Sequence, residues 1–106
     1  MGSLTKTFND YGIEQKTTFD SDFDIADSFG IDAVKDTYKR AKKEWKNNVE
    51  YFAELVMVLN WKCWQHYYRK NNELGMLYKD LYYDADAIAY DTFKGDELNY
   101  YIRMTD

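Results

Sequence analysis

Apolar and aromatic side chains recur at helical spacing through the middle of this 106-residue chain. Successive members are three or four residues apart. The mean step of about 3.67 matches an ordinary α-helix better than the 3.5-residue repeat of a left-handed coiled coil. The row consists of Val34, Tyr38, Ala41, Trp45, Val49, Phe52, Val56, Leu59, Cys63 and Tyr67. Asn47-Asn48 is the expected bend or break, because Asn side chains compete for backbone hydrogen bonds.

Cap and stop signals predict a short helix ahead of this row. Ser21 is a suitable N-cap, and Gly30 tolerates the backbone conformation that ends many helices. A helix over about residues 22–29 is therefore expected. Asp32 is then expected to cap the long helical region.

The same signals divide the C-terminal third of the chain. Asn72 is a suitable cap for a helix that runs to Lys94. Gly95 follows a base in the last turn and predicts a stop, after which Asp96 caps a short final helix.

These elements predict an all-α fold, a small helical bundle with two long helical regions and short flanking helices. The length favours a single domain, which we expect over residues 21–106. Residues 1–20 show no helical period and are predicted to form an irregular N-terminal arm. Residues 1–3 of this arm resemble a cloning remnant.

Aromatic residues supply much of the surface that such a bundle can bury. Leu, Ile, Val and Phe are few, whereas there are 11 Tyr and 3 Trp. The predicted core is formed by Trp45, Phe52, Val56, Leu59, Leu77 and Leu81. No apolar run approaches the length of a membrane span. The single unpaired Cys and the lack of an export signal predict a cytoplasmic protein.

No residue set in the sequence predicts catalysis or metal binding. Cys63 and His66 are one turn apart, but the chain has no other Cys or His, and zinc sites need three or four ligands. We expect a buried thiol and a hydrogen-bonded imidazole in a core that includes Trp61, Trp64 and Tyr68. No nucleophile, base and orienting group can be assembled. The expectation is therefore a non-enzymatic protein with no catalytic residues, metal or cofactor.

Charge is segregated along the chain, whose net charge is −5. Four lysines at steps of 4, 3 and 4 form one stripe on the helix that begins near Asp32, and two further bases flank it. The stripe is Lys35, Lys39, Lys42 and Lys46, with Arg40 and Lys43 at its sides. It predicts either a solvated face that pairs with the acidic segments or a surface that contacts a phosphate backbone.

An acidic row occupies the last long helix. Asp80, Asp84 and Asp91 share one face, and Glu97 lies just beyond Gly95. These carboxylates are either a solvated surface or a negative face that covers a basic, nucleic-acid-binding channel. Tyr residues among the acids suit a protein–protein interface.

Several segments resemble small proteins of bacterial conjugative elements and prophages. The resemblance is carried by Leu55–Tyr67, Leu77–Tyr82, Thr92–Tyr101 and Thr105-Asp106. Small acidic proteins of such elements are often accessory or anti-defence factors, including inhibitors of CRISPR nucleases. The resemblance thus implies a partner protein of the host or a phage, and no catalytic residues.

Two functions are expected from these observations. The first is a protein-binding accessory or anti-CRISPR factor that occupies a nucleic-acid-binding protein through Asp80, Asp84, Asp91 and Glu97. The alternative is a nucleic-acid-associated protein that uses the basic stripe at 35–46, with direct nucleic-acid binding the less favoured. No membrane partner is expected, and a homodimer is left open.

Overall fold

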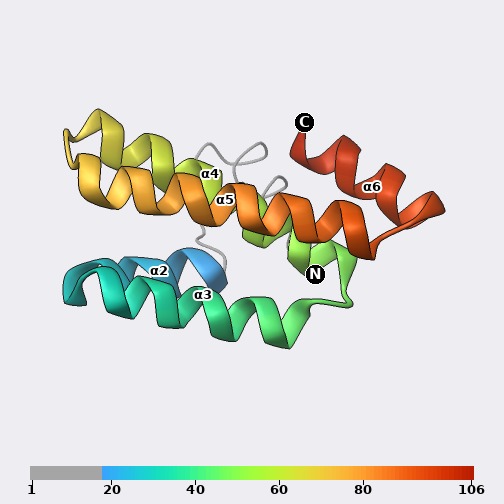
Figure 1. The fold of residues 1–106 in the computed structure, drawn as a ribbon, viewed down its shortest axis with the longest axis horizontal. Coiled ribbons are helices and arrows are strands. Elements are labelled where there is room, and N and C mark those ends of the chain that lie inside the picture. The colour runs from blue at the N-terminus through green and yellow to red at the C-terminus, as the bar shows by residue number, and fades with distance from the viewer. Residues whose placement is uncertain (1–17) are drawn as a thin grey trace.

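The computed structural model describes residues 18–106, which form five helices and no strand (Figure 1). The helices are α2 (Thr18–Phe29), α3 (Ile31–Trp45), α4 (Val49–Tyr68), α5 (Asn72–Thr92) and α6 (Gly95–Thr105). The predicted all-α bundle is confirmed. The predicted break at Asn47-Asn48 is also confirmed, because it lies between α3 and α4.

The helices are arranged in two layers (Figure 1). Helices α2 and α3 form one pair, and the longer α4 and α5 form the second pair, which packs on the first. Helix α6 turns back from the end of α5 and packs on α4. Short connections favour this arrangement, because they leave consecutive helices as antiparallel neighbours.

Two Asn side chains begin the long helices. Asn48 accepts a hydrogen bond from the Tyr51 backbone N–H at 3.2 Å, and Asn71 accepts one from Leu74 at 3.3 Å. The predicted cap at Asn72 is therefore wrong by one residue, since Asn72 is the first residue of α5. Asn71 and Asn72 are the same residue type and equally suitable as caps, so only the backbone geometry shows which of them caps the helix.

The N-terminal part of the bundle differs from the prediction. Helix α2 begins at Thr18, so Ser21 lies inside the helix and residues 18–20 do not belong to an irregular arm. Buried Phe19 and Phe23, one turn apart, extend the apolar face of α2 toward its start. The remainder of the predicted arm lies outside the described residues.

The link between α2 and α3 corrects a second cap. Gly30 ends α2 as predicted, with φ 108° and ψ −170°, a conformation that side chains with a Cβ rarely adopt. Gly30 also occupies the N-cap position of α3, so Asp32 falls within the first turn of α3 and does not cap it. At this position its carboxylate still interacts favourably with the positive end of the helix dipole.

The junction of α5 and α6 also differs from the prediction. Helix α5 ends at Thr92, before Lys94, because Phe93 turns into the core with an extended backbone. The Phe93 ring lies 5.9 Å from that of Phe52 and 6.4 Å from that of Tyr101. Helix α6 starts at Gly95, and its N-cap position is Lys94 rather than Asp96.

Helix α4 is the centre of the core. The N-terminal half of this helix is buried almost all round, as its nearly continuous apolar sequence predicts. Of the predicted core residues, Phe52, Val56 and Leu59 are fully buried. Trp45, Leu77 and Leu81 are only half-buried and pack against the edge of the core.

Gly75 explains how closely α5 approaches α4. A Cβ at Gly75 would lie 3.0 Å from Cδ1 of Tyr67, so the Tyr67 ring occupies the space that a side chain would need. The helix-propensity cost of glycine, about 1 kcal/mol relative to alanine, is thus offset by closer packing of the two long helices.

Truncating Phe52 tests the central role of α4. We expect Phe52→Ala to lower the free energy of unfolding by about 3–5 kcal/mol, because it removes a fully buried ring in contact with Phe93. The midpoint of urea denaturation measures this change. Tyr68→Ala, at the exposed end of the same helix, is the control and should shift the midpoint little. Equal midpoints for the two variants would contradict the assignment of the core.

Candidate interaction surfaces

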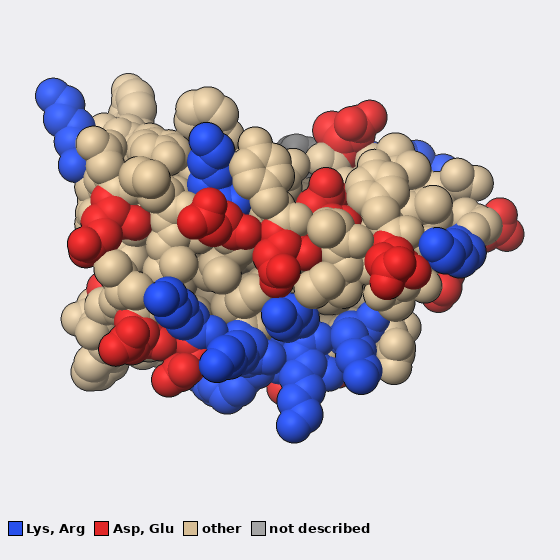
Figure 2. Space-filling model, in the orientation of Figure 1, with Lys and Arg blue, Asp and Glu red and all other residues tan. Residues whose placement is uncertain are grey.

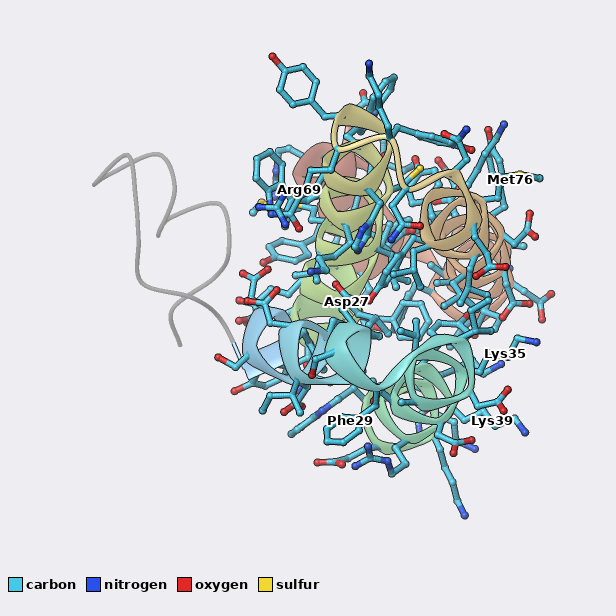
Figure 3. All side chains as sticks on the ribbon, turned by 90° about the vertical axis from the view of Figure 1, so that its left-hand side faces the viewer. Asp27, Phe29, Lys35, Lys39, Arg69 and Met76 are labelled. Carbon is cyan, nitrogen blue, oxygen red and sulfur yellow. The ribbon has the colours of Figure 1, made fainter. Side chains whose placement is uncertain are left out.

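A buried ionic network joins α2 to α4 and α5. The Lys62 side chain of α4 is only 3 % exposed, and its Nζ lies 2.7 Å from Asp24 Oδ1 and 2.6 Å from Asp27 Oδ2. Asp27 also accepts a 2.5 Å hydrogen bond from the Tyr78 hydroxyl of α5. Figure 3 shows Asp27 between the two layers of helices. The network positions α2 rather than forming an open site.

Cys63 is a buried thiol and His66 a hydrogen-bonded imidazole, as predicted. His66 is buried, and its Nε2 lies 2.8 Å from Asp27 Oδ2. Its ring stacks on Tyr78, with the two ring planes 7° apart. The Cys63 thiol is buried, and burial raises its pKa, so the nucleophilic thiolate is disfavoured. Among residues 18–106, no group of three His, Cys, Asp or Glu side chains is arranged to hold a metal ion.

Three tyrosines bridge helices by donating to aspartates. Besides Tyr78, Tyr38 of α3 donates to Asp84 of α5 at 2.5 Å, and Tyr101 of α6 donates to Asp86 at 2.6 Å. Burial, and then the hydrogen bond to the carboxylate, raises the pKa of each of these hydroxyls. Three of the 11 Tyr residues therefore join helices through Asp side chains. Spacing could not reveal this, since each pair links different helices.

The basic stripe and the acidic row lie side by side. Figure 2 shows the lysines of α3 along the lower edge of the molecule, with carboxylates of α5 directly above them. Lys42 Nζ lies 3.3 Å from Asp84 Oδ2 and 4.8 Å from the centre of the Tyr38 ring. The two predicted charge surfaces thus meet at Asp84, and their fields partly cancel there.

The other predicted charged residues are exposed. Asp80 and Asp91 lie on α5, and Glu97 lies separately in the first turn of α6. Lys35 and Lys39 point away from the bundle (Figure 3). Arg40 is exposed and donates to Thr37 at 3.3 Å, Lys43 is exposed on the last turn of α3, and Lys46 is exposed at its C-cap position.

The C-terminal half of α4 presents a surface that sequence reasoning placed in the core. Trp61, Trp64 and Tyr68 are 50 %, 65 % and 92 % exposed. They are three and four residues apart, so they share one face of α4, here called the aromatic face. The sequence contained a sign of this exposed surface, because apolar residues cover more of the circumference of α4 than one bundle can bury.

Two shallow grooves border the aromatic face. One, of about 360 Å³, is lined by Trp61, Trp64, Gln65, Tyr68 and Arg69. The other, of about 280 Å³, lies between α4 and α5 and is lined by Asn60, Cys63, Trp64, Tyr67, Lys79, Tyr82 and Tyr83. Trp64 lines both, so the aromatic surface extends from α4 onto α5.

No protein-family model matches the chain, and no curated protein or solved structure is significantly similar to it. The resemblance to proteins of conjugative elements and prophages therefore stays a prediction from the sequence. No helix in the part of the chain that the structure describes is both long and apolar enough to span a membrane.

Removing the carboxylate of Asp27 tests the buried network. We expect Asp27→Asn to lower the free energy of unfolding by about 3–5 kcal/mol, because it leaves the buried Lys62 ammonium with less compensating charge. Asp22→Asn removes an exposed carboxylate from the same helix and is the control. Equal melting temperatures for the two variants would show that the network does not hold α2.

The bridging tyrosines predict how stability depends on alkaline pH. A tyrosine in water has a pKa of about 10. The raised pKa values of Tyr38, Tyr78 and Tyr101 mean that the folded state favours the neutral hydroxyls. Their contribution to stability is therefore complete below about pH 10 and is lost as the pH rises further.

In a titration followed by tyrosinate absorbance, these three rings should ionise only as the helical circular-dichroism signal is lost. Tyr101→Phe should remove one ring from that late step. Ionisation of every tyrosine before any loss of helix would contradict the prediction.

Proposed function

We propose that this protein is a non-enzymatic protein-binding factor that docks on its partner through the aromatic face of α4. The observation that carries the proposal is the exposure of Trp61, Trp64 and Tyr68 on one side of a helix whose other half forms the core. Trp and Tyr are enriched at the energetic centres of protein interfaces, where they bury much surface and lose little side-chain entropy.

The chemistry around the aromatic face favours a partner with an apolar anchor flanked by acidic groups. The groove beside Trp61 and Trp64 has an apolar floor that suits one or two inserted side chains. Arg69 stands at its rim, Lys70 follows Arg69, and Lys79 lines the neighbouring groove. Cations at a rim steer acidic groups and improve specificity more than affinity.

Two features support binding over catalysis. The imidazole of His66 is held by Asp27 and the ring of Tyr78, so it faces the core rather than a groove. The Cys63 thiol has a raised pKa and is a poor nucleophile. These are the only His and Cys residues of the chain.

A second candidate is the expected anti-CRISPR or related factor that occupies a nucleic-acid-binding protein with carboxylates. The exposed Asp80, Asp91 and Glu97 favour it. Asp84 contributes less to such a surface, because it already accepts from Tyr38 and pairs with Lys42.

Distinguishing the two candidates requires a partner protein. A protein that co-purifies with the chain is identified, and its binding is then measured with the pure protein. CRISPR nucleases are among the partners tested. Trp64→Ala or Tyr68→Ala should weaken binding by at least about 2 kcal/mol, roughly thirtyfold, in isothermal titration. Phe29→Ala, which truncates an exposed ring on α2, is the control and should bind as the unmodified chain does.

The double variant Asp80→Asn, Asp91→Asn tests the second candidate in the same binding measurement. Binding lost in this variant and retained in Trp64→Ala would favour the acidic surface and contradict docking through the aromatic face.

A further inference from the structure

A groove outside the aromatic face is lined by six residues, five of which carry a side-chain hydrogen-bond donor, although most of the lining surface is apolar. It lies between the C-terminal end of α3 and the second half of α5 and has a volume of about 520 Å³. Its lining residues are Lys42, Lys43, Lys46, Asn47, Ile88 and Thr92. Three ammonium groups, an amide and a hydroxyl around one open groove match the oxygen atoms of phosphate groups.

The ammonium groups of this groove differ in how far they are neutralised. Lys42 pairs with Asp84. Among residues 18–106, no carboxylate lies within 4 Å of the ammonium of Lys43 or Lys46. The acids nearest to them in the sequence are Glu44 and Glu50, and Asp91 lies next to the lining residue Thr92 on α5. Lys43 and Lys46 therefore keep their charge available to a ligand.

The positive surface continues beyond the groove along α3. Lys35 and Lys39 share the face of Lys42 and Lys46 and point outward (Figure 3), and the lysines form a continuous band in Figure 2. Eleven residues of helix span about 16 Å. This length is enough for the band to follow several successive phosphates of one strand.

We propose that the lysine groove and the adjoining band bind the phosphate backbone of a nucleic acid. The regular steps along α3 suit a repeating anion better than the irregular carboxylates of a protein surface. The groove contains no aromatic side chain for base stacking, so binding depends on phosphate and tolerates any base sequence. Lys42 is held in place by Asp84 and the Tyr38 ring, whereas Lys43 and Lys46 supply the contacts to phosphate.

Fluorescence anisotropy with an oligothymidine strand and a duplex of equal length, at several salt concentrations, tests this proposal. Lys43→Gln with Lys46→Gln removes two charges and keeps helix propensity. We expect binding at low salt, and a slope of log affinity against log salt that is lower by about 2 in this variant. Comparing strand with duplex shows which form supplies the phosphates, and lysine-dependent binding of either supports the proposal.

The matched control is Lys94→Gln with Arg103→Gln, which removes the same charge from an exposed residue at the N-cap position of α6 and an exposed residue within α6. It should leave the salt slope near that of the unmodified chain, and melting temperatures confirm that both variants fold. Three results would overturn the proposal: no binding of either oligonucleotide at low salt, equal losses in the two variants, or equally tight binding of polyglutamate.

Discussion

The burial of Lys62 is the constraint on which the arrangement of the helices depends. An ammonium group inside a small core is costly unless carboxylates compensate it. Helix α2 supplies Asp24 and Asp27 at 2.7 and 2.6 Å, and Tyr78 of α5 completes the environment of Asp27. Helix α2 therefore occupies a position that keeps both aspartates against α4. The ionic network links the two layers, and the burial of apolar and aromatic side chains around it drives their packing.

Hydrogen bonds between tyrosine and aspartate side chains determine how much of the chain's negative charge forms an acidic surface. Asp27, Asp84 and Asp86 each accept a hydrogen bond from a tyrosine of another helix, and Asp84 also neutralises part of the lysine stripe. A net charge of −5 thus does not become one acidic face. Exposed aromatic rings instead gather on the aromatic face of α4, and among residues 18–106 no carboxylate lies within 4 Å of Lys43 or Lys46 at the end of α3.

The two proposed surfaces lie toward opposite ends of α4. Trp61, Trp64 and Tyr68 occupy its C-terminal half, whereas Lys46 and Asn47 directly precede its first turn. A helix of this length spans about 30 Å, which separates the aromatic face from the groove end of the lysine surface. The band of Lys35 and Lys39 runs back along α3, antiparallel to α4, toward the end of the molecule that carries the aromatic face (Figure 1).

Local patterns in the sequence determined the all-α class, the break at Asn47-Asn48, the end of α2 at Gly30 and the buried state of Phe52, Val56 and Leu59. Each depends on helical period or backbone propensity, which act over a few residues. The start of α2 and the end of α5 required tertiary structure, because buried Phe19 and Phe93 outweigh the local cap signals. Tertiary structure also decided the functional surfaces. Spacing places Trp61 and Trp64 on an apolar helix, but only the packing of α5 and α6 leaves them exposed. Likewise, the lysine stripe is visible in the sequence, but its pairing with Asp84 and its groove with α5 exist only where distant segments meet.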